Sequence, residues 1–181
     1  MAVHAQYLAG RNEDEYTRNS ERLFRKKIAR LIYPEARELI AAHQAKGHSV
    51  AIISSATPYQ VLPAAKDLNI DRVFCTGLEV EDGRFTGAVV KPTCFGEGKV
   101  DAAQALARDT GADLSQSFFE SDSVDDIQLL EYVGRPVTLN PRKRLKQITK
   151  ENNWPTTTFD SRGRISVNRF LRSVAATGSL V

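Results

Sequence analysis

The sequence predicts an α/β domain with a mainly parallel sheet. Short apolar runs alternate with amphipathic segments along the chain, which is the pattern of repeated strand–helix units. The run at residues 50–53 is apolar at every position, as in a strand that is covered on both faces. A hairpin-turn signal, Asp82-Gly83, interrupts the alternation, so we also expect one small β-hairpin.

Two helices are predicted ahead of this strand and one directly after it. Apolar residues recur at helical spacing among many charges between residues 16 and 31. Pro34 suits the first position of the second helix, and Gly47 stands where the carboxyl-terminal cap of that helix belongs. After the strand, a capping box formed by Thr57 and Gln60 begins the third helix.

The alternation continues through the rest of the chain. The elements expected in order are strands at 72–75, 78–80 and 84–86, a helix at 98–108, a strand at 117–120, a helix from 123, a strand at 136–139 and a basic helix at 142–150. Gly111 stands where the alanine-rich helix at 98–108 is expected to end.

Composition and charge are those of one globular domain. The chain has 181 residues, of which 41% are hydrophobic and 26% charged, and both fractions are near the average. The net charge of +3 is too small and dispersed to indicate a nucleic-acid-binding surface, so no nucleic-acid partner is expected. Only two cysteines, Cys75 and Cys94, are present, which excludes a disulfide-stapled scaffold. Without a transmembrane segment or a signal peptide, a cytoplasmic protein is expected.

Ser55 is the first candidate site residue, because ligands of open α/β sheets bind at the carboxyl ends of the strands. Its hydroxyl and the backbone N–H groups that follow would face an anion at the amino terminus of the next helix. The alternative is that Ser54, Ser55 and Thr57 are only turn and capping residues. This segment alone favours the alternative.

An acidic cluster follows the strand at 117–120. It places four carboxylates within residues 120–126, and carboxylates packed together repel one another unless a cation lies between them. Mg²⁺ suits such oxygen ligands. Alternatively, Ser123 caps the next helix and the acids complement the helix dipole. Capping explains Asp125 and Asp126 well and Asp122 less well, so both interpretations stay open.

Lys99 is the third candidate, at the start of its predicted helix. A cation there is unfavourable, which suggests a compensating anion, although a single lysine is more often a surface residue. Taken together, the three positions predict an anion site with a divalent cation.

The ordered set resembles the motifs of the haloacid dehalogenase-like phosphatases, specifically subfamily IB, which is similar to phosphoserine phosphatase. The resemblance implies that Ser55 and Lys99 are catalytic and that Ser55, Ala56 and Lys99 bind the phosphoryl group. It implies that Asp122 and Asp126 hold Mg²⁺. It also implies a Rossmann-like three-layer sandwich with the remnant of a helical cap at the amino terminus, and a small phosphorylated substrate.

The resemblance covers residues 34–141, and one family motif is absent. Family members begin with an apolar strand that ends in Asp-x-Asp, whose first aspartate attacks phosphorus. No acid before Pro34 follows an apolar strand. Since the family places that strand between those of its second and fourth motifs, three alternatives are open. The chain lacks an amino-terminal piece, which would make Met1 a doubtful start, or the two flanking strands pair directly, or another segment fills the gap.

We expect residues 1–33 to form an amino-terminal segment with a partial helical cap, 34–152 the α/β core, and 153–181 a tail. The predicted function is a Mg²⁺-dependent phosphomonoester hydrolase that is weak or inactive as given, because the nucleophile is missing. The alternative is a non-catalytic anion- or Mg²⁺-binding remnant or interaction module. A third possibility is that the basic helix at 142–150 and the arginines of the tail dock on an acidic surface, but charged faces are usually only solvated.

Overall fold

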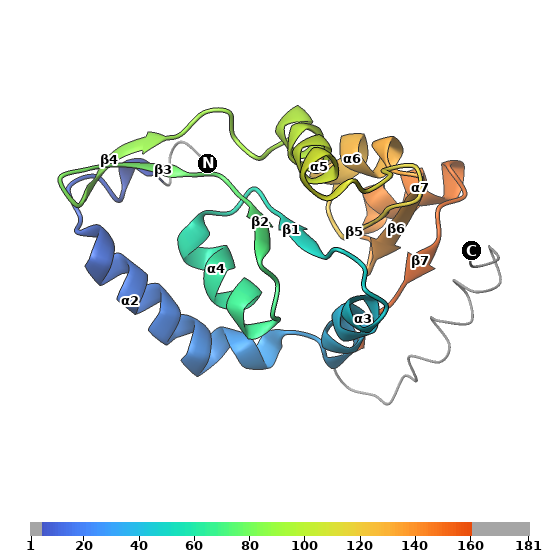
Figure 1. The fold of residues 1–181 in the computed structure, drawn as a ribbon, viewed down its shortest axis with the longest axis horizontal. Helices are drawn as coiled ribbons and strands as arrows, with labels where there is room; N and C mark the ends of the chain where they lie inside the picture. The colour runs from blue at the N-terminus through green and yellow to red at the C-terminus, as the bar shows by residue number, and fades with distance from the viewer. Residues whose placement is uncertain (1–4, 161–181) are drawn as a thin grey trace.

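A computed structural model gives the fold of the chain and describes residues 5–160 (Figure 1). The helices are α2 (Glu13–Leu23), α3 (Pro34–Ala45), α4 (Pro58–Asp67), α5 (Glu97–Thr110), α6 (Ile127–Tyr132) and α7 (Lys143–Glu151), with shorter helical turns η1 (Phe24–Ile28), η2 (Ala29–Leu31) and η3 (Val124–Asp126). The strands are β1 (Ala51–Ile53), β2 (Arg72–Phe74), β3 (Leu78–Glu81), β4 (Arg84–Val89), β5 (Phe118–Ser121), β6 (Arg135–Leu139) and β7 (Thr156–Thr157). Each predicted element is present, with bounds that differ by a few residues. The arginines of the predicted tail lie outside the described residues.

The strands confirm an α/β fold with parallel pairing in its main body. β1 pairs in parallel with β2, while β5, β6 and β7 form a second parallel sheet in that order. The predicted hairpin is β3–β4, and its turn residues Asp82 and Gly83 both have positive φ angles, 50° and 72°. This is the conformation that a two-residue hairpin turn requires, and it is why the Asp-Gly pair predicts the turn.

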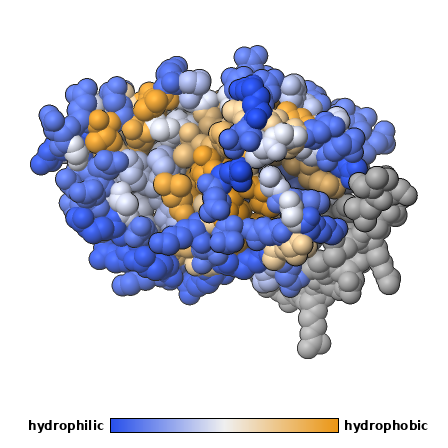
Figure 2. Space-filling model, viewed as in Figure 1, coloured by the Kyte–Doolittle hydropathy of each residue, from blue (hydrophilic) through white to orange (hydrophobic). Residues whose placement is uncertain are grey.

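The main sheet is in two parts, which the strand pattern alone does not predict. β1 and β5 belong to separate sheets, and within residues 5–160 no other strand is hydrogen-bonded between them. Neither direct pairing of the two strands nor a filling segment is therefore seen in the described part of the chain. Figure 2 shows apolar residues gathered over β1 and β2 on one face, and the three residues of β1 are only partly buried. The strand is less buried than its apolar pattern predicts, because it has no paired neighbour on one of its edges among residues 5–160.

Helices cover the two half-sheets from both sides and form three layers. On one side, Ala103 of α5 and Leu129 of α6 form a buried cluster with Val133, against which Ile53 of β1 and Phe119 of β5 both pack. This shared core joins the half-sheets although their strands do not pair.

On the other side lies α3. The His43 ring of α3 meets the Phe118 ring of β5 edge-on, with centroids 5.5 Å apart. α7 packs on β6, where the Thr149 hydroxyl lies 3.3 Å from that of Thr138.

The amino-terminal helix lies across α4 and the hairpin. Tyr16 of α2, Tyr59 of α4 and Phe85 of β4 form a three-way cluster of edge-to-face rings, with centroid separations of 5.2–5.4 Å. Ahead of α2, the Gly10 amide donates to the Phe85 carbonyl at 2.8 Å, and the Phe85 amide donates to the Arg11 carbonyl at 3.1 Å. The hairpin thus holds the segment that precedes the helix. Among residues 5–160, no helix has the length and apolar character needed to cross a bilayer.

Candidate functional site

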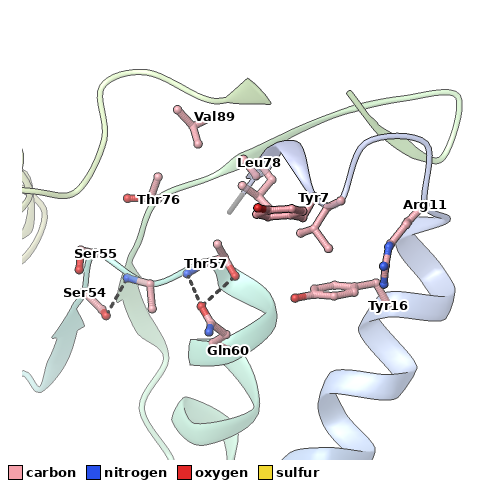
Figure 3. Close-up of a pocket in the computed structure, with 13 residues that line it drawn as sticks. Tyr7, Arg11, Tyr16, Ser54, Ser55, Thr57, Gln60, Thr76, Leu78 and Val89 are labelled. Carbon is pink, nitrogen blue, oxygen red and sulfur yellow. Dashed lines mark hydrogen bonds between the residues drawn. The ribbon is translucent and has the colours of Figure 1, made fainter. Parts of the chain in front are cut away.

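A pocket of about 600 Å³ lies where β1 leads into α4 (Figure 3). One wall comes from the β1–α4 loop and α4, a second from the amino-terminal segment and α2, and a third from the residues after β2 and from the hairpin. In that order, the lining residues are Ser54, Ser55, Ala56, Thr57 and Gln60; Ala5, Tyr7, Leu8, Arg11 and Tyr16; and Thr76, Leu78 and Val89. Ser55, the first predicted site residue, therefore lines a pocket at the carboxyl end of its strand, as expected.

The β1–α4 loop is held by short-range hydrogen bonds. The Thr57 amide donates to the Gln60 side-chain oxygen at 3.2 Å, which confirms the predicted capping box. The Ala56 amide, predicted to bind phosphate, donates instead to the Ser54 hydroxyl oxygen at 3.2 Å. The Ser55 hydroxyl has no hydrogen-bond partner within residues 5–160 and is available to a ligand. Thr57 and Gln60 thus cap the helix, whereas the Ser55 hydroxyl is left free of such contacts among residues 5–160, so the loop remains compatible with both interpretations.

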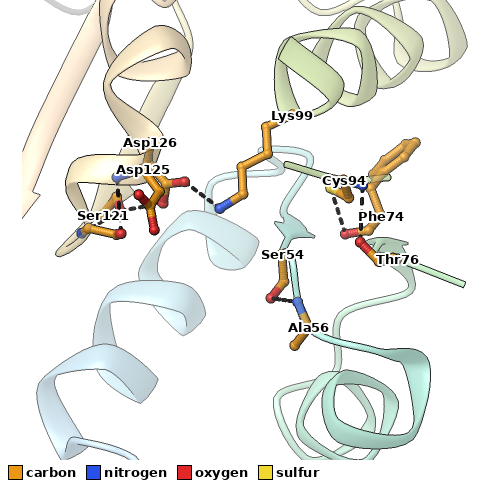
Figure 4. A network of polar contacts seen from close by, with 10 residues as sticks. Ser54, Ala56, Phe74, Thr76, Cys94, Lys99, Ser121, Asp125 and Asp126 are labelled. Carbon is orange, nitrogen blue, oxygen red and sulfur yellow. Dashed lines mark hydrogen bonds and ion pairs between the residues drawn. The ribbon is translucent and has the colours of Figure 1, made fainter. Parts of the chain in front are cut away.

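Lys99 and Asp126 form a buried ion pair (Figure 4). Their residues are only 6% and 7% exposed, so Lys99 is not the surface residue that a single lysine would suggest. The second carboxylate oxygen of Asp126 accepts a hydrogen bond from the Ser121 hydroxyl at 2.6 Å, and that hydroxyl accepts one from the Ser123 amide at 3.1 Å. A buried charge needs such partners. The end of β5 therefore fixes the position of the Lys99 amino group.

The ion pair lies close to the end of β1. In Figure 4 the Lys99 amino group points between Asp126 and Ser54. Cys94 lies near both Lys99 and Ser54. Burial raises the pKa of its thiol, whereas the charge of Lys99 and a hydrogen bond with the Ser54 backbone lower that pKa. Lys99 does not line the pocket itself. The structure thus brings two predicted residues to the ends of β1 and β5, with Ser55 lining the pocket and Lys99 on the β5 side (Figure 4).

The two predicted metal ligands differ in their surroundings. Asp122 follows β5, is exposed, and has no side-chain partner among residues 5–160. Both carboxylate oxygens of Asp126 are already engaged, by Lys99 and Ser121. No group of three or more histidine, cysteine or acidic residues in the described chain is arranged to hold a metal ion. The oxygen chemistry suits Mg²⁺, which binds through one or two carboxylates and keeps several waters, and the unengaged donor is Asp122.

Sequence reasoning assigned no separate role to several residues of this region. Ser121, which anchors Asp126, stands at an ordinary strand end in the sequence. Glu120 lies beside it in β5 with Oε1 buried and without a partner, and burial raises the pKa of its carboxyl to about 7. A glutamate within an apolar strand was the available signal. Tyr7 and Arg11 gave no signal in the sequence. Their segment is held beside the pocket by Arg84, whose side chain donates a hydrogen bond to the Gly10 carbonyl, 74 residues earlier in the chain.

Comparisons with known proteins identify the relatives of this chain. The family model of haloacid dehalogenase-like hydrolases matches residues 1–131. A probable phosphatase of Mycobacterium tuberculosis is 36% identical over 73% of this chain and 46% of its own length. A phosphoserine phosphatase of the same organism is 33% identical over 96% of this chain and 58% of its own length. The chain therefore spans about half the length of these curated relatives.

Among solved structures, a protein of unknown function from Bordetella pertussis superposes with a TM-score of 0.79 at 28% identity. The match covers 88% of this chain and 72% of that one.

Proposed function

Because the chain belongs to the haloacid dehalogenase-like hydrolase family, we propose that it carries most of the active site of a Mg²⁺-dependent phosphomonoester hydrolase. The resemblance to phosphoserine phosphatase inferred from the motifs agrees with the relatives found. The observation that carries the proposal is the position of Ser55, which lines a pocket at the amino terminus of α4 and whose hydroxyl has no hydrogen-bond partner among the described residues. The substrate would be a small phosphorylated molecule, and we propose a cytoplasmic location.

Each residue of the site would act on the phosphoryl group in a different way. The Ser55 hydroxyl would donate a hydrogen bond to a phosphoryl oxygen, aided by the positive end of the α4 dipole. Lys99 would neutralise charge that develops on the phosphoryl oxygens, which is where catalysis of this transfer chiefly acts. Its pairing with Asp126, which Ser121 holds in turn, supports a fixed position for that charge.

Asp122 would hold Mg²⁺, because its carboxylate is exposed and unengaged at the carboxyl end of β5. When bound, the ion supplies positive charge against the phosphoryl oxygens. The predicted metal role of Asp126 stays a proposal, and it would have to be compatible with the contact to Lys99. Asp126 acts in this structure as the partner that positions the lysine.

The nucleophile is the part that these residues do not supply. None of the described residues that line the pocket carries a carboxylate, and no strand of residues 5–160 pairs between β1 and β5, which leaves that position open in the described sheet. A strand placed there, parallel to its neighbours, would bring its carboxyl end close to both Ser55 and Lys99. We therefore propose that the 181 residues alone turn over little or no ester and that such a strand with a terminal aspartate restores turnover.

Hydrolysis of 4-nitrophenyl phosphate with Mg²⁺ tests both the proposed hydrolase site and the proposed role of the added strand. The chain is compared with the same chain extended at its amino end by a designed apolar strand that ends in Asp-x-Asp. We expect turnover only from the extended chain, and its loss in Lys99→Ala but not in Lys150→Ala, an exposed lysine of α7. No turnover from either chain refutes the hydrolase. Turnover by the unextended chain that Lys99→Ala abolishes shows instead that the nucleophile lies within these residues.

A non-catalytic anion- or Mg²⁺-binding module is the second candidate, favoured by the absence of a carboxylate from the pocket lining. Calorimetric titration with phosphate and with Mg²⁺ separates the two. Binding without turnover in both chains supports the module, and failure to bind either ion removes it.

A further inference from the structure

The pocket beside Ser55 is divided by chemistry into two ends. Hydroxyl groups of Ser54, Ser55 and Thr57 line the end formed by the β1–α4 loop. The opposite walls are mainly apolar or aromatic, with Leu8, Tyr7 and Tyr16 from the amino-terminal segment and α2, and Leu78 and Val89 from the hairpin, and they also include Arg11 and Thr76. A ligand that fits both ends needs an anionic head and an apolar body.

Two tyrosine rings form the most distinctive part of the apolar end. In Figure 3, Tyr7 and Tyr16 extend from the amino-terminal side, and the hydroxyls of both are turned toward the side of Thr57. Tyr7 is 74% exposed, so most of its ring would be covered only by a ligand. At the wall of a pocket, such a ring offers apolar surface whose burial by a ligand is favourable.

The rest of the structure holds the Tyr16 ring and the backbone segment that carries Tyr7. Tyr16 is held at 5.3 Å from Tyr59 and 5.4 Å from Phe85 by edge-to-face contacts. The segment with Tyr7 is tied to the hairpin through the Gly10 amide, which donates to the Phe85 carbonyl at 2.8 Å. The Tyr16 ring and the backbone of both residues are thus preorganised, and little ordering of the backbone is needed when a ligand binds.

We infer that the pocket takes phosphate monoesters whose organic group is a flat aromatic ring, held against Tyr7 and Tyr16 with the phosphoryl group at Ser55. This inference rests on the proposed hydrolase function and specifies its substrate class. A flat ring gains from both area burial and ring-to-ring contact, which a branched or charged aliphatic group of equal size does not. The pocket volume of about 600 Å³ leaves room for such a group beyond the phosphoryl group.

Binding of non-hydrolysable phosphonates to the full chain with Mg²⁺ tests the inference. Calorimetry compares phenylphosphonate, cyclohexylphosphonate, methylphosphonate and inorganic phosphate. We expect phenylphosphonate to bind roughly tenfold more tightly than methylphosphonate and several-fold more tightly than cyclohexylphosphonate. Tyr7→Ala should remove most of this preference and leave the affinity for inorganic phosphate unchanged.

Two matched variants show whether the ring itself is responsible. Tyr7→Phe keeps the ring and should keep the preference within about twofold. Tyr132→Ala removes a tyrosine that is 46% exposed and outside the pocket, and it should change nothing.

The outcomes also separate this inference from the proposed function. Equal binding of the phenyl, cyclohexyl and methyl compounds, with phosphate still bound, overturns the inference and leaves the anion site standing. A phenyl preference that survives Tyr7→Ala likewise overturns it. If no phosphonate and no phosphate binds, the anion site of the proposed hydrolase fails and the inference fails with it.

Discussion

Glu120 should make the stability of the protein fall as pH rises. Its side chain alternates along β5 with that of Phe119, which faces the α5 side, and so shares the opposite face with Phe118 and α3. Its Oε1 is buried without a partner, and burial raises the pKa of the carboxyl from 4.5 to about 7. The native state therefore prefers the protonated form over the range in which the unfolded chain has already lost the proton.

The magnitude follows from the difference between the two pKa values. Below pH 4.5 both states are protonated and the group has no effect on the free energy of unfolding. Between 4.5 and about 7 only the unfolded state releases its proton, so the native state loses stability steadily. Since one pKa unit corresponds to 1.36 kcal/mol, the total amounts to about 3 kcal/mol and is fully expressed above pH 7. That is a large part of the roughly 5–15 kcal/mol typical of a domain.

Urea unfolding of the metal-free protein at pH 5 and pH 8 measures this effect. We expect Glu120→Gln to remove about 2–3 kcal/mol of the stability difference between the two pH values. Only the change with pH is compared, because the buried amide of glutamine has its own desolvation cost. Glu131→Gln, at an exposed position of α6, is the control and should keep the wild-type pH dependence. If Glu120→Gln and the wild type lose the same amount of stability between pH 5 and pH 8, the argument from burial is refuted.

Three further changes test the packing around the site. Phe85→Ala should lower the free energy of unfolding by about 3–5 kcal/mol in urea titrations, because this ring is 2% exposed and joins α2, α4 and the hairpin; a loss below about 1 kcal/mol would show that the cluster does not hold them. Lys99→Met and Asp126→Leu should each cost about 3–5 kcal/mol, whereas the double variant should cost clearly less, since each single change leaves a buried charge unpaired; additive losses contradict the pairing. Gly134→Ala should prevent soluble expression or lower the melting temperature steeply, because a Cβ there would lie 1.6 Å from the Ser115 carbonyl oxygen; a wild-type melting curve would rule out that close approach.

The elements of the fold could be predicted because they depend on neighbours in sequence. The capping box of Thr57 and Gln60, the positive φ of Asp82 and the end of α5 at Gly111, in the left-handed conformation, are all local features. The order of Ser55, Lys99 and the acids after β5 also gave the strand ends at which the site lies. Local spacing and the order of elements were enough for these.

The parts that could not be predicted depend on contacts across the chain. The burial of Lys99 depends on Asp126, 27 residues away, and on the Ser121 hydroxyl that holds it. The sequence could suggest an anion near the lysine, but it could not show that the anion is a carboxylate of the chain itself. The amino-terminal wall of the pocket likewise depends on Arg84, whose side chain reaches the Gly10 carbonyl 74 residues earlier.

The open position between β1 and β5 also bears on how the protein behaves in solution. A complete sheet has two outer edges, whereas two separate half-sheets add two inner ones, and exposed strand edges are templates for pairing with other chains. One feature limits that risk: β1 has only three residues and so offers a short edge for pairing. The net charge of +3 at pH 7 also grows as the pH falls, and molecules of like charge repel one another. Acidic conditions should therefore favour both the stability of the fold, through Glu120, and its colloidal solubility.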